Sequence, residues 1–331
     1  MSGKDSWMYL DVDEETLDKY RGIQHKHNVT NPLMYREELV KHFQGDPNKN
    51  GLAMPWGQLD GFRVRPGEVT VAAAANFAGK SALMGQCATQ WMREDTKILL
   101  ISPEFSPATN LSRIVQQVCG KQPADITEAD VTAVLIWLEG RMLVYDALGQ
   151  IEVEDICAVS HYASEELGVT MVILDNLTVL KLVGETNTAQ GELMTDLIQT
   201  ARTTGLHIFV VAHTRKPQAG EEFGRYSIRG ASQISDLADN VIMIERNEKK
   251  EKLLADISLT EEERKEIRYQ SDTKVKIGKQ RHGSAATPTA KLYFSPISMR
   301  WYEKMKYVDR PFQEVVEMSS LGGNIVRTGT V

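Results

Sequence analysis

The sequence predicts an α/β domain in which a mostly parallel central sheet is covered by helices on both faces. Short apolar runs at 69–75, 97–102 and 171–175 have the length of buried strands, and segments with helical periodicity separate them. The runs are apolar throughout rather than alternating, which is typical of parallel strands that are buried on both faces. A glycine-containing turn at 75–79 joins the first of these strands to a helix.

Along the chain, the pattern gives a regular succession of strands and helices. The run VTVAAAA at 69–75 is followed by a helix at about 80–92, and KILLIS at 97–102 is the second strand. Because no helix separates the strands after Gly278, that edge of the sheet is expected to be antiparallel. The later strands are predicted at 142–146, 169–175, 207–212, 240–245, 273–279 and 291–294, and the later helices at 153–166 and 191–204.

The sequence also predicts three parts. We expect residues 1–60 to form a short helical N-terminal extension, residues 61–303 the α/β core domain, and residues 304–331 a C-terminal tail. Within the extension, residues 33–43 have a helical pattern with apolar residues roughly on one side. This side packs either on its own domain or on a neighbouring subunit, and the pattern alone does not choose between them.

Composition and charge exclude several classes of protein. With 42% hydrophobic and 25% charged residues the chain lies in the globular range, which excludes wholesale disorder and a fibrous protein. The net charge of −7 argues against a protein coated with basic surface for nucleic acid, but it allows positive charge confined to a channel or a few loops. The charged run at 248–272 is expected to be a solvated insertion with a helix near 260–269.

Apolar stretches and cysteines indicate the compartment. No stretch approaches the roughly 18 apolar residues of a membrane span, and the acidic N-terminus does not resemble a signal peptide. Cys87, Cys119 and Cys157 are scattered without a CxxC pair, so we expect buried thiols in a reducing compartment rather than a zinc site. The sequence therefore predicts a cytoplasmic protein without a membrane partner.

The strongest chemical signal directly follows the first strand. The segment AANFAGKS (74–81) fits the phosphate-binding pattern GxxxxGK[ST], except that Ala74 stands at the first glycine. Backbone N–H groups of such a turn and of the helix N-terminus bind phosphate oxygens. Lys80 would neutralise the β- and γ-phosphates, and the Ser81 hydroxyl would coordinate Mg²⁺. The nucleotide-binding residues are expected to be Ala75, Asn76, Phe77, Ala78, Gly79, Lys80, Ser81 and Ala82.

Three further strand ends carry polar residues suited to a nucleoside triphosphatase. Asp175 ends the run at 171–175, where a Mg²⁺-binding Walker B carboxylate belongs. Glu104 follows the second strand, where it could orient and deprotonate the attacking water. His213 follows the strand at 207–212 and could hydrogen-bond to the γ-phosphate, although a single strand-end histidine is more often structural.

The order of these motifs resembles the RecA-like motor domain of replicative hexameric DNA helicases. The phage primase–helicase and mitochondrial Twinkle branch is the most similar, and the DnaB type, in which Ala also replaces the first P-loop glycine, is next. The resemblance implies a RecA-like P-loop NTPase core. We expect no primase part, because the zinc-binding cysteines and the chain length for one are absent. The matching blocks are AANFAGKS, ISPEFS, MVILDNL, VVAHTRKP, SIRGASQISDLADNVIMIERN and KQRHG, between about Gly51 and Tyr302.

The resemblance also implies roles for individual residues. It gives the P-loop, Asp175 and Glu104 the roles stated above, and it makes His213 the link between the γ-phosphate and the DNA-binding loops. Lys279 and Arg281 correspond to basic fingers that reach the nucleotide of a neighbouring subunit. The helix at 33–43 would then be a linker helix that docks on that neighbour. Residues of two loops are expected to bind DNA: Arg215, Lys216, Arg229, Gly230 and Ala231.

Together, these observations predict a ring-forming, NTP-dependent replicative DNA helicase that translocates on single-stranded DNA and unwinds duplex DNA. We expect Mg²⁺ with ATP or dTTP as substrate, a homo-hexamer or heptamer, a DNA polymerase or primase as further partner, and, for a phage-encoded protein, the host cytoplasm. One alternative is a RadA- or RecA-like recombination or branch-migration ATPase, since RadA-type chains share the K-x-R-x-G stretch. Another is a binding module that uses nucleotide only as a structural switch, and Glu104 argues against it.

Overall fold

The computed structural model describes residues 31–44, 50–146, 149, 151–177, 187–215, 224, 227–228, 232–256, 258–283 and 287–321. The chain divides into two compact units, residues 1–47 and 48–331. This division lies before the predicted boundary at residue 60. The physical reason is that Trp56 and Leu59, which are only 3% and 1% exposed, pack in the core of the second unit.

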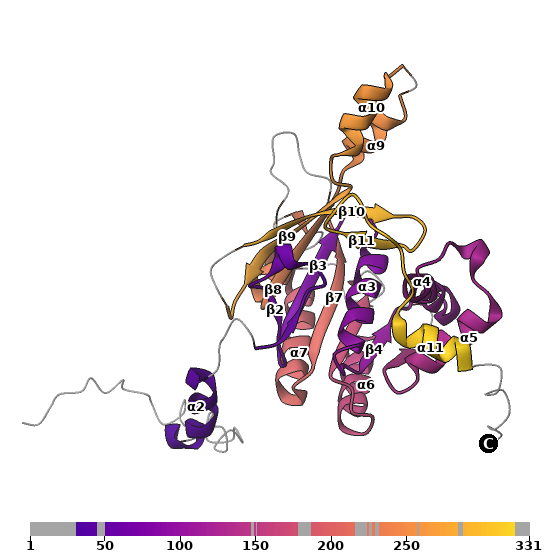
Figure 1. The fold of residues 1–331 in the computed structure, drawn as a ribbon. Helices are drawn as coiled ribbons and strands as arrows, with labels where there is room; N and C mark the ends of the chain where they lie inside the picture. The colour runs from indigo at the N-terminus through magenta and orange to yellow at the C-terminus, as the bar shows by residue number, and fades with distance from the viewer. Residues whose placement is uncertain are drawn as a thin grey trace, which may run out of the picture. The chain divides into compact units, whose positions relative to one another are not determined.

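One sheet organises the second unit (Figure 1). Within the described residues it has nine strands, in the order β11-β10-β9-β8-β3-β7-β6-β4-β5. The neighbours from β8 to β5 are parallel, whereas β9, β10 and β11 form an antiparallel edge, as predicted. The strands are β3 (Val69–Ala74), β4 (Ile98–Ile101), β5 (Met142–Tyr145), β6 (Met171–Asp175), β7 (His207–His213), β8 (Asn240–Arg246), β9 (Thr273–Gln280), β10 (Thr289–Ser295) and β11 (Arg300–Tyr302).

Every predicted strand is therefore present, with small differences at the ends. Two short strands that the sequence did not predict, β1 (Leu52–Ala53) and β2 (Arg63–Val64), precede β3 in the sequence and pair with each other. The fold class, a mostly parallel sheet with helices on both faces, is confirmed.

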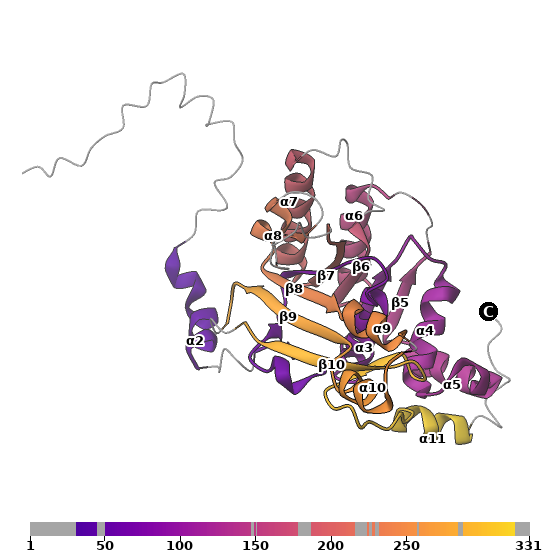
Figure 2. The same ribbon diagram turned by 90° about the horizontal axis from the view of Figure 1, so that it is seen from above.

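Helices cover both faces of the sheet (Figure 2). The side chains of the parallel strands alternate between two hydrophobic cores, so that Ala72 of β3 belongs to one core and Val71 to the other. One face carries α3 (Lys80–Met92), α4 (Pro107–Cys119), α5 (Glu128–Leu138) and α11 (Gln313–Leu321), and the other carries α6 (Val153–Glu165), α7 (Asn187–Thr204) and α8 (Ser232–Leu237).

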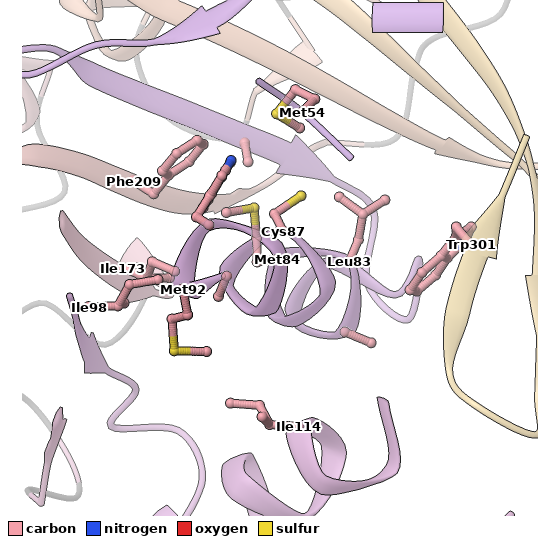
Figure 3. Close-up of a cluster of buried hydrophobic side chains, with 14 of the residues drawn as sticks. Met54, Leu83, Met84, Cys87, Met92, Ile98, Ile114, Ile173, Phe209 and Trp301 are labelled. Atoms are coloured by element: carbon pink, nitrogen blue, oxygen red, sulfur yellow. The ribbon is translucent and has the colours of Figure 1, made fainter. Parts of the chain in front are cut away.

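Helix α3 is enclosed on several sides, which fixes the element that follows the phosphate-binding loop. Figure 3 shows its Leu83 and Cys87 among side chains from the sheet, with Ile114 of α4 on another side. Near the end of α3, the ring of Trp91 stacks on Phe209 of β7 at a centroid distance of 5.1 Å. Because burying a side chain of this size contributes about 1.5–3 kcal/mol, the helix is held firmly against the sheet.

The first unit contains the helix predicted over residues 33–43. It consists of a 3₁₀ turn, η2 (Pro32–Tyr35), followed by α2 (Arg36–Gln44). The side chain of Asn31 caps the turn by accepting a hydrogen bond from the N–H of Leu33 at 3.0 Å. Leu33 and Phe43 are 75% and 81% exposed.

Two predictions about the charged and terminal segments need correction. The helix predicted near 260–269 is present as α10 (Glu261–Arg268), and the insertion contains a further helix, α9 (Glu248–Leu254), that the sequence did not predict. It is also not wholly solvated, since Lys250 is only 6% exposed. The predicted C-terminal tail contains α11, which packs on α5 and buries Val315. Apolar residues of α11 at helical spacing are the physical reason.

Candidate nucleotide-binding site

The phosphate-binding loop connects β3 to α3. Gly79 ends the loop with a left-handed backbone, at φ +82°, which glycine adopts without steric cost. A side chain at this position would also meet Trp301, because a Cβ atom would lie 2.8 Å from its Cζ2. The first N–H groups of α3 have no partner within the helix, so they can bind an anion at this turn.

Lys80 is the first residue of α3, and its side chain reaches back to the loop. Its Nζ donates hydrogen bonds to the carbonyl of Ala75 at 3.1 Å and to Nδ1 of His213 at 3.0 Å. Since an ammonium group only donates, Nδ1 of His213 accepts in this pair. Burial lowers the pKa of Lys80, whereas the charges of Asp175 and Glu104 act in the opposite direction.

Asp175 and Ser81 form the oxygen-rich part of the site. The Ser81 hydroxyl is hydrogen-bonded to the carboxylate of Asp175. Burial raises the pKa of Asp175, and the Ser81 hydrogen bond and the Lys80 charge counteract this rise. A buried carboxylate next to a hydroxyl suits Mg²⁺, which prefers oxygen ligands and takes further ones from phosphate and water.

Glu104 reaches the same site from the neighbouring strand. It follows β4 and is exposed, and its Oε2 accepts a hydrogen bond from the side-chain amide of Asn176, the residue after Asp175. This contact joins the loops that follow β4 and β6. A carboxylate in this place is open to water and acts electrostatically on Lys80, an environment that suits a general base.

The sheet register explains why these residues meet. His213 pairs with Ala74, and Val211 pairs with Asp175, so β3, β7 and β6 end at the same edge of the sheet. The structure thus brings Lys80, Ser81, Asp175, Glu104 and His213 together. Two residues of the predicted segment, Ala78 and Ala82, have side chains that pack in the core, so only their backbone groups are available to a ligand.

Sequence reasoning missed two residues of this site, Asn176 and Arg113. Arg113 lies on α4, with its guanidinium 4.5 Å from the centre of the Phe105 ring, and it lines a small pocket together with Ser81 and Asp175. Asn176 could have been noticed as a polar residue directly after a strand end. Arg113 carries no local signal, because only the folding of α4 against the sheet brings it to Asp175.

A larger pocket opens beside the loop, with a volume of about 970 Å³. It is lined by the loop residues 75–78, by the ends of β7 and β8, by α9 and by the start of β9. A volume of this size accommodates a nucleotide-sized ligand.

Lys279 and Arg281 lie at the opposite edge of the sheet. Lys279 donates to the carbonyls of α8 and the turn after it, and Arg281 forms an ion pair with Asp239 at 3.0 Å. Because β9 is antiparallel to β8, residues at the end of β9 lie beside Asn240 at the start of β8. The structure therefore does not bring these two cations to the loop of their own subunit.

Of the expected DNA-binding residues, only Arg215 lies within the described part of the chain; Lys216, Arg229, Gly230 and Ala231 lie outside it. The backbone N–H of Arg215 donates to the carbonyl of Ser227 at 2.8 Å, and Thr214 bridges to Ile228. The two predicted loops therefore start next to each other.

The three cysteines are free thiols. Cys87 and Cys119 are buried, as expected, whereas Cys157 is only partly buried. Burial raises the pKa of Cys119 to about 11. Within the described ranges, no three His, Cys, Asp or Glu side chains are placed to share a metal ion. None of the helices that the structure describes combines the length and the apolar character needed to cross a membrane.

Comparison with known proteins agrees with this geometry. The family described as the DnaB-like helicase C terminal domain matches residues 54–303. The chain is 25% identical over 208 residues to a DNA helicase/primase of Enterobacteria phage T3. This match covers 56% of the chain but 36% of the phage protein, so the chain spans about a third of the length of this relative.

Two solved structures have a similar fold. A structure described as an ATPase domain matches with a TM-score of 0.67 and 17% identity, over 81% of this chain and 97% of that one. A DnaB-like replicative helicase, solved together with its interactions with primase, matches with a TM-score of 0.65 and 16% identity, over 87% and 70% of the two chains. At this level of identity, both matches concern the fold.

Proposed function

Since the chain belongs to the family of DnaB-like helicase C-terminal domains, we propose that it is the motor of a ring-forming replicative DNA helicase. It would hydrolyse a nucleoside triphosphate in order to move along single-stranded DNA and separate the duplex. The match to a helicase family favours unwinding over the RadA-like or RecA-like alternative.

One observation carries this proposal: Lys80, Asp175, Glu104 and His213 meet at one edge of the sheet. Lys80 would stabilise the charge that spreads over the transferred phosphoryl group. Glu104 would orient the attacking water and accept its proton. His213, which is already bonded to Lys80 and followed by Arg215, would pass the state of the γ-phosphate on to the DNA loops.

A magnesium ion fits the oxygen atoms of the site. Ser81 and Asp175 would hold it, and it would neutralise phosphate charge when bound. The loop residues Ala75–Ala82 would hold the phosphates of ATP or dTTP.

A distance within the protomer supports the proposed trans position of the basic fingers. Strand β8 has 7 residues. At about 3.3 Å per residue, its two ends lie about 20 Å apart. Lys279 and Arg281 are at one end and the P-loop is at the other, so neither cation reaches the nucleotide of its own subunit. We therefore propose that Arg281, with Lys279, completes the site of the next subunit.

The assembly proposed from these features is a hexamer or heptamer around single-stranded DNA. The first unit, residues 1–47, would serve as the extension whose helix, α2, docks on the adjacent subunit. Arg215, Lys216, Arg229, Gly230 and Ala231 of each copy would face the strand and attract its phosphates. A DNA polymerase or primase is the proposed further partner, and the host cytoplasm the proposed location.

Mixing two inactive variants tests the trans mechanism. Arg281→Ala keeps its own P-loop but offers no finger, whereas Lys80→Ala offers a finger but lacks the loop lysine. Each alone should release phosphate at least about a thousandfold more slowly than the wild type. An equal mixture should recover activity, because roughly a quarter of the interfaces in a random assembly combine both intact parts.

The control is Arg141→Ala, which removes an arginine that covers Trp137 far from the loop. It should hydrolyse normally. A mixture that stays inactive although mixed rings form would exclude the trans finger. Unwinding of forked DNA with tails of either polarity, measured beside the mass of the native assembly, tests the helicase proposal itself; a protein that hydrolyses but never separates strands would contradict it.

A further inference from the structure

The charged insertion lies beside the nucleotide site. Helices α9 and α10 project from the end of the sheet at which β8 ends and β9 begins (Figure 1). Because β8 is parallel to β3, this is the edge that carries the P-loop.

The base of the insertion, where α9 follows β8 and β9 begins, is firmly anchored. The side chain of Asn247 caps α9 by accepting from the N–H of Lys250 at 3.1 Å, and it donates to the carbonyl of Ser271 at 2.9 Å. The buried ammonium of Lys250 forms an ion pair with Asp272 at 2.7 Å and donates to the carbonyl of Gln270 at 2.6 Å. The orientation of α9 is therefore fixed relative to the strands.

A chain of contacts ties α9 to the P-loop. Arg246, the last residue of β8, donates from Nη1 to the carbonyl of Phe77 at 2.6 Å. The Nε of the same guanidinium donates to Glu251 of α9, also at 2.6 Å. The insertion thus contacts the loop through one shared arginine and does not extend freely into solvent.

The pocket of about 970 Å³ includes both elements, and its charge is predominantly positive. Its acidic members are Glu245 and Glu248. Glu248 is paired with Lys252 at 3.7 Å, and both side chains are largely exposed, so the contact is loose and open to exchange. The cations that line the pocket are Arg215, Arg246, Lys249, Lys252 and Lys274.

We propose that α9 is a wall of the nucleotide site, in which Lys249 and Lys252 contact the phosphates of the bound nucleoside triphosphate. This inference rests on the proposed function and deepens it. A nucleoside triphosphate is strongly anionic, and cations in a concave pocket raise its local concentration and hold it. In this proposal the two lysines contact the phosphates other than the reacting γ-phosphate, so they would serve binding rather than the chemical step.

Removing both lysines tests the proposal. In the full chain, Lys249→Ala/Lys252→Ala should weaken binding of mant-labelled ATP and dTTP about fivefold at low salt, as expected for two partly exposed charge contacts. The KM for hydrolysis should rise by the same factor while kcat stays unchanged. The difference should shrink as ionic strength rises, because salt screens exposed charges.

The matched control is Lys265→Ala/Lys304→Ala. It changes the net charge equally, and neither residue lines the pocket. The inference is overturned if KM changes no more in Lys249→Ala/Lys252→Ala than in the control. It is also overturned if Lys249→Ala/Lys252→Ala loses affinity for single-stranded DNA but not for nucleotide, since the pocket would then bind DNA. Hydrolysis and unwinding by the wild-type chain are measured separately, so a failure of the helicase proposal is distinguishable from a failure here.

Discussion

Replacing Gly79 by alanine tests whether the P-loop is held in place by Trp301 of the edge strand β11. A Cβ atom at this position would lie 2.8 Å from Cζ2 of Trp301 on β11. The Trp301 side chain has little room to move. Its indole Nε1 donates a hydrogen bond to the Thr273 hydroxyl at 3.1 Å, and the backbone N–H of Trp301 donates to the Gln86 side chain at 2.7 Å. The loop would have to shift instead, and Lys80 would shift with it.

The expected cost has two parts. A left-handed backbone costs a residue with a Cβ about 1–2 kcal/mol. The overpacking against Trp301 adds about 1–3 kcal/mol. The smaller entropy of the unfolded alanine chain returns less than about 1 kcal/mol. We therefore expect Gly79→Ala to lower the free energy of unfolding by about 3 kcal/mol.

Gly140→Ala provides the matched control. Gly140 also has a left-handed backbone, at φ +74°, but a Cβ there would have no neighbour within 4 Å. This variant should lose about 1 kcal/mol, from the backbone alone. Guanidinium unfolding followed by tryptophan fluorescence measures both values, and mant-ATP binding should weaken in Gly79→Ala only. Equal losses of stability in the two variants would refute the role assigned to Trp301.

Two further predictions concern pH and the metal. Burial lowers the pKa of His207 to about 4, from 6.5 in water, so between these values the unfolded chain binds a proton that the folded chain does not. The free energy of unfolding should therefore fall by about 3 kcal/mol as the pH falls through this window. The measurement is urea unfolding at pH 7.5 and 4.5 in a Glu68→Gln background. Burial raises the pKa of Glu68 to about 7, so this residue would make the free energy of unfolding depend on pH in the opposite direction. A free energy of unfolding that is equal at the two pH values would contradict the reasoning. Asp175→Asn should fold but lose Mg²⁺-dependent phosphate release at least about a hundredfold, and a magnesium titration that matches the wild type would remove Asp175 from the metal site.

The sequence was sufficient for those parts of the site that depend on local patterns. A short motif identifies Lys80 and Ser81, and the strand-end positions of Asp175 and Glu104 can be read from apolar runs alone. Parallel strands then bring such ends to one edge, whatever lies between them in the chain. His213 needed the family resemblance in addition.

Contacts between distant segments could not be predicted in this way. The charge-rich run around Lys250 resembles a solvated segment, but its partner Asp272 lies 22 residues further on and converts one lysine into a buried anchor. Arg113 and Trp301 likewise reach the P-loop region only after α4 and the antiparallel edge have packed. Periodicity describes which face of an element is buried, and it does not indicate which distant residue covers that face.

The placement of Arg281 and the P-loop at opposite edges of the sheet makes each protomer directional. Under the proposed trans mechanism, each protomer presents Arg281 on one side and its nucleotide site on the other, so any assembly built on this contact is head-to-tail. In a linear row of protomers, the nucleotide site of one terminal subunit would lack Arg281 from a neighbour and would not hydrolyse. Only a closed ring would supply every nucleotide site with an arginine from the adjacent subunit. A gap opened to admit a DNA strand would therefore silence the one catalytic centre that borders it.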